Sequence, residues 1–230
     1  MNILAMDTSG PCASVALMQD GVVTHEETAR HGLTHSQTVL PMAERALECA
    51  GIKAQNVDIY ACAVGPGSFT GVRIGVTTVK ALAHAAGTRC IGVDALEALA
   101  YGACEFDGIL APMFDARRSQ VYAAAFKGGD EFKRVSDDVA APLEEFVASL
   151  PEGKVMFMGD GADANRARIL ALRPDARFAP AHLNFPRAAA ICALADMRAS
   201  ESVDYLTLKP LYLRAPQAER ERDRRMRKGL

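Results

Sequence analysis

The stretch ILAMD at residues 3–7 sets a pattern that returns as GILAPMFD at residues 108–115. In each copy an apolar strand ends on an aspartate, a short polar turn follows, and a second apolar strand leads to a glycine turn. The second strands are residues 12–19 and 120–127. Because each unit continues into alternating helices and strands, the sequence predicts a duplicated α/β architecture with mixed sheets.

Helices after these strands complete each unit. Residues 36–50 and 69–86 show apolar side chains at helical spacing, and each is followed by a glycine, Gly51 or Gly87, where glycine commonly ends a helix. Pro41 lies inside the first, so this helix is expected to begin or to kink there. The other expected elements are strands at 22–29, 59–64, 90–93 and 155–158, a turn at 159–163, and helices from Ala95, near 142–150, near 165–172 and at 186–199.

These units predict two lobes, residues 1–106 and 107–214, and the helix at 186–199 could pack back on the first lobe. The length of 230 residues suits two modest lobes as well as one large domain. Residues 215–230 carry six basic and three acidic side chains and little apolar surface, so we expect a flexible basic tail. A tail ordered by a partner and a basic arm that touches RNA are the alternatives.

The composition excludes several classes of protein. The 26 Lys+Arg and 28 Asp+Glu leave a net charge of −2, which gives no general attraction to nucleic acid or to membrane surfaces. No secretory signal opens the chain, and no apolar run reaches the roughly 18 residues of a membrane helix. The six cysteines lie in apolar segments without a CxxC pair, as expected of reduced, mostly buried thiols. The sequence therefore indicates a cytoplasmic protein with no membrane contact.

Asp7 and Asp115 stand at equivalent points of the two units. Two such carboxylates could face each other across a cleft and hold Mg²⁺ bound to nucleotide phosphates. Thr8 and Ser9 add hydroxyl and backbone N–H groups suited to phosphate oxygens. The alternative is purely structural, because Asp and Ser favour turns through local hydrogen bonds. The residues themselves leave both interpretations open.

The glycine-rich segment GPGSFTG at residues 65–71 lies between a predicted strand and a predicted helix, where anions often meet a helix N-terminus. Gly71 comes one residue too late for a dinucleotide-binding fingerprint. The dipeptide Val72-Arg73 stands where a P-loop has its lysine and hydroxyl residue. Phosphate binding of these two kinds is therefore not expected.

The helix predicted at residues 69–86 is strongly apolar. Its only charged side chains, Arg73 and Lys80, form a single polar stripe with Thr77 and His84. Such a helix must be covered almost all round. Gly71 and Gly75 would in addition cut grooves that admit another helix. Burial within the lobe accounts for one face, and a helix-to-helix protein interface is the functional interpretation of the rest.

Six segments carry a family resemblance: ILAMDTS (3–9), HSQTVLPMAERAL (35–47), GPGSFTGVRIGV (65–76), IGVDALEALA (91–100), FDARRSQVYAA (114–124) and PLYLR (210–214). Together they resemble the TsaB (YeaZ) family of bacterial tRNA threonylcarbamoyladenosine biosynthesis proteins. The resemblance spans about residues 1–214. It implies an actin-like ATPase fold (the sugar kinase/Hsp70/actin class) with two ribonuclease-H-like lobes and mixed sheets.

The resemblance also implies a subunit without catalytic activity. The catalytic paralogue, TsaD, carries two metal-binding histidines in the segment that matches residues 92–101. Here those two positions are Ala95 and Leu99, which cannot bind a metal, so no metal site is expected. The implied function is to bind a TsaD-type subunit, which transfers threonylcarbamoyl to N6 of adenosine 37 in tRNAs that read ANN codons. A TsaE-type ATPase and tRNA would be met through the complex, and the isolated chain would form a homodimer.

The helices at 36–50 and 69–86 would, by this resemblance, pack on the equivalent pair of the paralogue as a four-helix bundle. The interface residues then expected are Val39, Met42, Ala46, Gly71, Arg73, Ile74, Gly75, Thr78 and Leu82. A vestigial nucleotide cleft would comprise Asp7, Thr8, Ser9, Asp115, Gly159 and Gly161. Because Asp160 adds a negative charge near the phosphates, ATP or ADP is expected to bind only weakly or within the complex, and the isolated chain is expected to need no cofactor.

Two other functions stay open. A free-standing ATP-dependent transferase or phosphatase of the actin-like class would use Asp7 and Asp115. A peptidase could use Asp7-Thr8-Ser9, which is close to the turn of aspartic proteases. That enzyme needs a second copy of the turn, and the second unit has Asp115-Ala116-Arg117 instead. Binding of Mg²⁺ and ATP would distinguish the first alternative from a partner-binding subunit.

Overall fold

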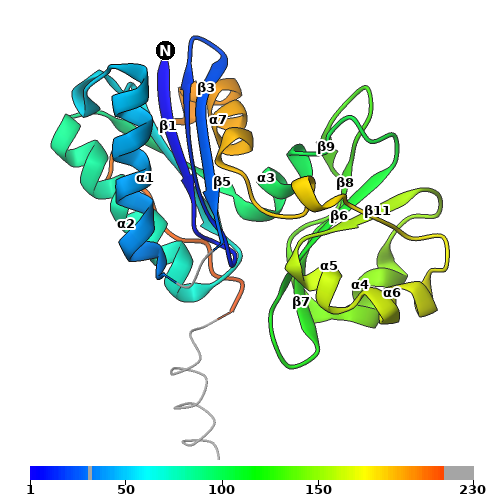
Figure 1. The fold of residues 1–230 in the computed structure, drawn as a ribbon. Coiled ribbons are helices and arrows are strands. Elements are labelled where there is room, and N and C mark those ends of the chain that lie inside the picture. Colours follow the sequence, from blue (N-terminus) through cyan, green and yellow to red (C-terminus); the bar gives the residue numbers. More distant parts are fainter. Residues whose placement is uncertain (31–32, 215–230) are drawn as a thin grey trace, which may run out of the picture.

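The computed structural model describes residues 1–30 and 33–214, which form two α/β lobes (Figure 1). Helix α3 (Ala95–Tyr101) lies where the chain passes from the first lobe to the second. Each lobe is built on one mixed sheet, so the predicted duplicated α/β fold is confirmed. The predicted tail at residues 215–230 lies outside the described residues.

The N-terminal sheet has the strand order β3-β2-β1-β4-β5. Its strands are β1 (Asn2–Asp7), β2 (Ala13–Gln19), β3 (Val22–Ala29), β4 (Ile59–Gly65) and β5 (Arg89–Asp94). The first three form the predicted antiparallel meander, and β4 and β5 lie parallel to β1. The central strand β1 is buried on both faces from Ile3 onward, as its unbroken apolar run indicates.

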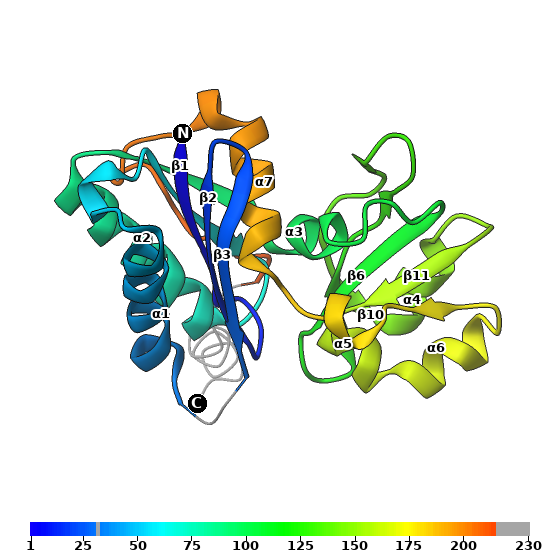
Figure 2. The ribbon, with the colours of Figure 1, turned by 45° about the horizontal axis from the view of Figure 1, so that its top comes forward.

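Helices cover both faces of this sheet (Figure 2). On one face α1 (His35–Ala50) and α2 (Phe69–Ala86) pack over Leu4 and Met6. On the other face α3 and α7 (Ala188–Met197) pack over Ile3 and Ala5. The alternation of buried side chains along β1 therefore supplies two separate hydrophobic cores.

Helix α1 begins at His35 and runs through Pro41, so the expectation that it begins at the proline is wrong. At its start the Gln37 side-chain oxygen accepts a hydrogen bond from the Thr34 backbone N (3.1 Å). Gly51 ends the helix in the left-handed conformation (φ 65°) that glycine adopts readily. A short 3₁₀ turn, η1 (Ala54–Asn56), then leads into β4.

The C-terminal sheet has the order β10-β7-β6-β11-β12, and β8 pairs with β6 and β9 at its edge. Its strands are β6 (Ile109–Asp115), β7 (Gln120–Ala123), β8 (Phe126–Lys127), β9 (Lys133–Arg134), β10 (Val139–Pro142), β11 (Val155–Met158) and β12 (Arg177–Phe178). The helices of this lobe are α4 (Leu143–Ser149), α5 (Asp160–Ala164) and α6 (Arg166–Leu172).

Two predicted elements of this lobe differ from the structure. The single strand expected at 120–127 is divided into β7 and β8, since Ala125 leaves the ladder and its N–H donates to the Ser136 hydroxyl (2.9 Å). The turn expected at 159–163 is largely helix α5, which begins directly after Gly159. Both errors arise at short elements, where tertiary contacts outweigh local sequence preference.

The chain finally returns to the first lobe. After η2 (Ala181–Leu183), α7 packs against β1 and β2, and η3 (Ala199–Glu201) leads to residues 202–211, which lie along β5 and α2. Residues 188–211 of the predicted second lobe therefore lie on the first sheet. Among residues 1–30 and 33–214, no helix has the length and hydrophobicity needed to span a bilayer. Four of the six cysteines are buried, and all six are free thiols.

Candidate functional site

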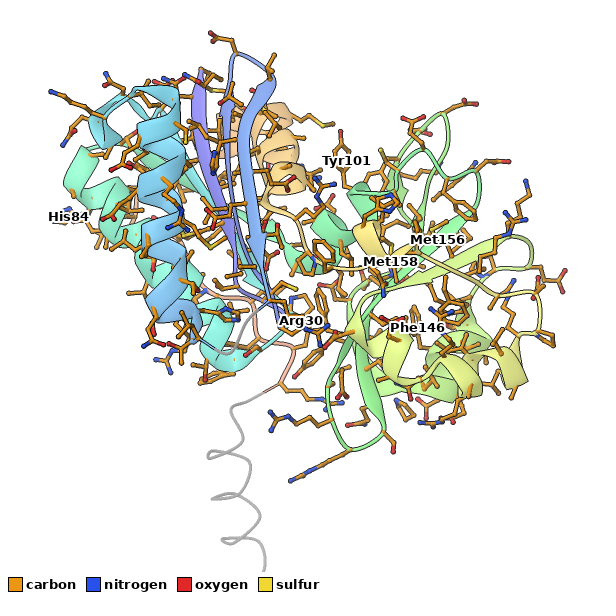
Figure 3. All side chains as sticks on the ribbon, viewed as in Figure 1. Arg30, His84, Tyr101, Phe146, Met156 and Met158 are labelled. Carbon is orange, nitrogen blue, oxygen red and sulfur yellow. The ribbon has the colours of Figure 1, made fainter. Side chains whose placement is uncertain are left out.

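A cleft of about 640 Å³ separates the two lobes at the ends of β1 and β6. Its walls come from four segments of the chain, residues 9–11, 66–70, 114–117 and 211–214, together with His35, Tyr122 and Asp160. Ser9 and Asp115, both expected in a vestigial nucleotide cleft, line it, but Asp7 lies behind the wall. Figure 3 shows Arg30, at the end of β3, on the side of the N-terminal lobe that faces the other lobe.

The turn after β1 is closed by its own lobe. The Asp7 side chain is fully buried, and its Oδ1 accepts hydrogen bonds from the backbone N and the hydroxyl of Ser9 (both 2.7 Å). The Thr8 hydroxyl donates to the Gly71 carbonyl (2.7 Å), and the Ser68 N–H donates to the Ser9 carbonyl (2.7 Å). The Thr8 hydroxyl is therefore taken up by the start of α2, and the Ser9 hydroxyl and N–H are taken up by Asp7.

Glycines make this closure possible. A Cβ on Gly67 would lie 2.4 Å from the Ser9 carbonyl oxygen, and a Cβ on Gly71 would lie 2.0 Å from that of Thr8. A Cβ on Gly75 would meet the Thr8 hydroxyl at 2.5 Å. The grooves predicted at Gly71 and Gly75 are thus filled by the chain's own Thr8 and do not face a partner helix.

Burial also changes the acidity of Asp7. Removal from water raises the pKa of its carboxyl group, although the two hydrogen bonds from Ser9 oppose this. Among the described residues no group donates a hydrogen bond to Asp7 Oδ2. Since Mg²⁺ binds the ionised carboxylate, a raised pKa weakens Asp7 as a ligand for it.

The turn after β6 is open. The Asp115 side chain is exposed, and its Oδ1 accepts a hydrogen bond from the Arg117 N–H (2.7 Å). Three consecutive non-glycine residues, Arg117, Arg118 and Ser119, have positive φ angles of 62°, 54° and 59°. Side-chain-bearing residues rarely adopt this conformation, so the turn carries backbone strain.

The glycines at the start of α5 pack against β6. A Cβ on Gly159 would lie 2.2 Å from the Met113 carbonyl oxygen, and a Cβ on Gly161 would lie 2.8 Å from the Phe114 carbonyl carbon. Between them, Asp160 faces the cleft, and burial raises the pKa of its carboxyl group. Its Oδ1 has no hydrogen-bond partner among the residues described.

A nucleotide with its Mg²⁺, as the actin-like fold would suggest, does not fit these residues. The Thr8 hydroxyl donates to the start of α2, the Ser9 hydroxyl and N–H donate to Asp7, and Asp7 is sealed beneath them. Within residues 1–30 and 33–214 no cluster of three or more His, Cys, Asp or Glu side chains could hold a metal ion. Ala95 and Leu99 are core residues of α3, with side chains that cannot bind a metal.

A second hollow, which we call the docking groove, lies between α1 and α2 and has a volume of about 520 Å³. It is lined by Ser36, Val39, Leu40, Phe69, Thr70, Arg73, Ile74, Thr77 and Thr78. Leu40 is 42% exposed, and Phe69 and Ile74 are half-buried. The groove therefore presents apolar surface on two neighbouring helices, with the exposed Arg73 and Thr77 beside it.

Only part of the predicted interface lies in this groove. Val39, Arg73, Ile74 and Thr78 line it, and Leu82 is half-buried further along α2. The other predicted residues face the lobe's own interior: Met42, Ala46, Gly71 and Gly75. Periodicity identifies the apolar face of a helix, but it does not tell whether that face meets the sheet or a partner.

Sequence reasoning missed Leu40 and Phe69. Leu40 is an exposed leucine outside the buried stripe of α1, which consists of Thr38, Val39, Met42, Ala43 and Ala46. A leucine outside the main stripe is the signal that could have revealed it. No comparable signal marks Phe69, because it stands at the first position of α2.

Residues 202–214 form a second missed feature, which we call the C-terminal strap. Lys80 Nζ donates to the Leu208 carbonyl (3.0 Å), and the His84 ring lies 4.4 Å from that of Tyr205. These two residues belong to the predicted polar stripe of α2. The strap therefore contacts Lys80 and His84 at one end of the stripe, although His84 stays exposed, as do Arg73 and Thr77 at the other end.

Comparisons with known proteins identify relatives of this chain. The family model described as "TsaD: tRNA N6-adenosine threonylcarbamoyltransferase" matches residues 14–221. The chain is 32% identical to the tRNA threonylcarbamoyladenosine biosynthesis protein TsaB of Bacillus subtilis, over 95% of this chain and 96% of that protein. The solved structure of YeaZ from Pseudomonas aeruginosa superposes with a TM-score of 0.81 at 28% identity, covering 92% of this chain and 99% of that one.

A more distant similarity concerns the fold alone. The ROK hexokinase of Thermus thermophilus superposes with a TM-score of 0.50 at 11% identity, covering 87% of this chain and all of that one. This agrees with the actin-like fold that the sequence implied. The near-complete match to TsaB together with the YeaZ superposition shows that the chain belongs to the TsaB (YeaZ) family of tRNA threonylcarbamoyladenosine biosynthesis proteins.

Proposed function

We propose that this chain is a non-catalytic subunit that binds a TsaD-type threonylcarbamoyltransferase through the docking groove and thereby supports modification of adenosine 37 in tRNAs that read ANN codons. The observation that carries the proposal is the groove itself, because two neighbouring helices leave apolar side chains uncovered there. An uncovered apolar hollow of this kind commonly marks a protein interface.

The chemistry of the groove suits a pair of partner helices. Leu40 and Ile74 offer aliphatic contacts from α1 and α2, and small side chains such as Thr77 and Thr78 allow close approach. Arg73 stacks its guanidinium over the Phe69 ring (5.0 Å to the centroid), which leaves a charge beside the apolar surface. An apolar centre with a polar rim is the common plan of specific interfaces.

The absence of catalysis is proposed from two other places in the chain, the position of the paralogue's metal site and the turn at Asp7. The position of the paralogue's metal site holds Ala95 and Leu99, and Asp7 is buried behind a closed turn. We infer that the isolated chain needs no cofactor, that it binds ATP or ADP weakly or only within the complex, and that a TsaE-type ATPase and tRNA contact it as part of that complex.

Self-association follows from the same surface. When the partner is absent, the groove of one copy can be covered by the helices of a second copy, so the isolated chain forms a homodimer at sufficient concentration. Sedimentation velocity of the isolated chain measures this. A monomer at every concentration would contradict self-association through the groove.

A single charge in the groove tests the proposal. Leu40→Glu places a carboxylate at the centre of the predicted contact and should weaken binding of the transferase subunit about 30-fold or more, as loss of an interface hot spot does. Isothermal titration calorimetry with the transferase subunit of the same organism measures it. Leu170→Glu makes the same change at a leucine of equal exposure on α6 (40% against 42%) and should bind normally. Equal affinities of both variants for the transferase subunit would rule out the groove as its binding site.

One observation favours the alternative function, an ATP-dependent enzyme that works alone. The inter-lobe cleft is large enough for a small molecule, and Asp115 and Asp160 both line it. Titration with Mg²⁺ and ATP separates the two proposals. A dissociation constant near the micromolar range, with turnover lost in Asp115→Ala, would support the enzyme. A peptidase has no comparable support, because Asp7 is sealed and Asp115 is followed by a different turn.

A further inference from the structure

The C-terminal strap is held along the N-terminal lobe at several points. The backbone N–H and C=O groups of Val203 pair with those of Cys90 (2.7 and 2.8 Å). Further along, the Leu211 N–H donates to the Val64 carbonyl (2.7 Å). Gly65 (φ 116°) permits this approach, because a Cβ there would lie 2.5 Å from the Leu211 carbonyl oxygen. The segments GPGSFTG and PLYLR, distant in sequence, thus meet in space.

The end of the strap crosses to the other lobe. Arg214 Nη2 donates to the Ala140 carbonyl (3.1 Å), and its guanidinium lies 5.6 Å from the ring centroid of Tyr122. Ala140 and Tyr122 are paired residues of β10 and β7 in the C-terminal sheet. One side chain therefore joins the strap, anchored on the first lobe, to the sheet of the second lobe across the mouth of the cleft.

The strap also touches the docking groove. The Tyr212 ring lies 5.0 Å from the Phe69 ring, at the first position of α2. Phe69 lines both the groove and the cleft, as does its neighbour Thr70. Phe69 thus contacts the strap and also lines the groove.

We propose that the C-terminal strap is a latch between the two lobes whose closure is coupled to occupation of the docking groove through Phe69 and Tyr212. The coupling rests on the proposed function, because a partner in the groove is what would act on it. A partner helix that covers Phe69 restricts its ring and so favours the stack with Tyr212, which holds Arg214 against the second lobe. By thermodynamic linkage, a closed latch then favours partner binding to the same extent.

The latch can be tested first in the full chain without any partner. Hydrogen exchange of the Leu211 amide, measured by NMR, reports opening of the strap. Arg214→Ala and Tyr212→Ala should each accelerate this exchange about tenfold, although neither contacts the hydrogen bond between Leu211 and Val64. Lys209→Ala, an exposed residue on the same strap, serves as the control and should leave the exchange unchanged. Unchanged exchange in both test variants would overturn the latch.

The coupling is tested by adding the transferase subunit. Saturation of the wild-type chain should slow Leu211 exchange, and Arg214→Ala should weaken binding about fivefold or more although Arg214 does not line the groove. If the partner binds wild-type chain and Arg214→Ala equally and leaves Leu211 exchange unchanged, the coupling is refuted and the proposed function survives. If the wild-type chain does not bind the partner at all, the proposed function fails, whereas the latch is still decided by the exchange rates of the isolated chain.

Discussion

The turn after β1 and the turn after β6 hold equivalent places in the two lobes but have different neighbours. In each lobe the strand next to them, β4 or β11, runs parallel and leads through glycines into a helix. In the first lobe that helix is α2, with 18 residues, and its start bonds to Thr8 and Ser9. In the second it is α5, with five residues, and Asp115 stays exposed.

This difference in helix length affects two surfaces of the molecule, the docking groove and the inter-lobe cleft. A long α2 closes the first turn and, beside α1, creates the docking groove. The short α5 covers less, so the second turn opens into the inter-lobe cleft. The closed first turn thus lies beside the proposed docking groove, and the open second turn lies in the cleft. Substitutions at matching points of the two units can test how much each turn contributes to the stability of the fold.

The largest effect is expected at Gly71. Gly71→Ala would press a Cβ to within 2.0 Å of the Thr8 carbonyl oxygen, and the chain's backbone must move to relieve it. We expect the free energy of unfolding to fall by about 3 kcal/mol or more, the upper range for an overpacked site. Urea unfolding measures this. Gly10→Ala, where the nearest contact is an ordinary 3.5 Å to the Pro186 ring, is the control and should change stability little.

The two aspartates should differ next. Asp7→Ala leaves the buried N–H and hydroxyl of Ser9 without their acceptor, which should cost about 2 kcal/mol of unfolding free energy. Asp115→Ala removes an exposed side chain and should change stability by no more than about 0.5 kcal/mol. Equal losses in the two variants, by urea unfolding, would show that the turns are not as different as their burial indicates.

The pH dependence of stability sharpens the same comparison. The folded-state pKa of Asp7 is raised by burial, so its contribution to stability is fully present below its unfolded pKa and is lost as pH rises through the folded value. Burial and the neighbouring Asp138 raise the pKa of Asp94 and act in the same direction. These two carboxyl groups should therefore make the unfolding free energy fall as the pH rises above about 4. Asp7→Asn should make this slope shallower, and an unchanged slope would contradict a raised pKa.

The smallest effect concerns strain in the open turn. Arg118 has φ of 54°, a conformation that costs a residue with a Cβ about 1 kcal/mol or more and that glycine adopts freely. Arg118→Gly should stabilise the chain by about 0.5 kcal/mol, since the greater freedom of glycine in the unfolded chain offsets part of the gain. Thermal unfolding measures it. Destabilisation would indicate that the arginine side chain makes a contact that outweighs the strain.

Much of the fold could be predicted from the sequence because its main signals are local. The alternation around Ile3 and Asp7, and the glycine ends of α1 and α2, arise from residues close together in the chain. The repeated strand-turn-strand pattern then predicted the two-lobed architecture. Short elements such as β8 and α5 were mispredicted, because their form depends on neighbours distant in sequence.

The candidate site was only partly predictable for the same reason. The sequence predicted an interface on α1 and α2, and four of the residues that it placed there, Val39, Arg73, Ile74 and Thr78, line the docking groove. It could not tell that Gly71 and Gly75 face Thr8, since that contact joins residues more than sixty positions apart. Nor could it reveal the strap, whose contacts with α2 and β7 depend on the return of the chain after the second lobe.

The central claim is that the chain acts through the groove and not through the cleft. The most direct test is threonylcarbamoylation of tRNA by a reconstituted system that contains the transferase subunit and, in turn, wild-type chain, Leu40→Glu or Asp115→Ala. We predict near wild-type modification with Asp115→Ala, loss of stimulation with Leu40→Glu, and no modification by this chain alone. Full activity with Leu40→Glu and loss with Asp115→Ala would contradict the account.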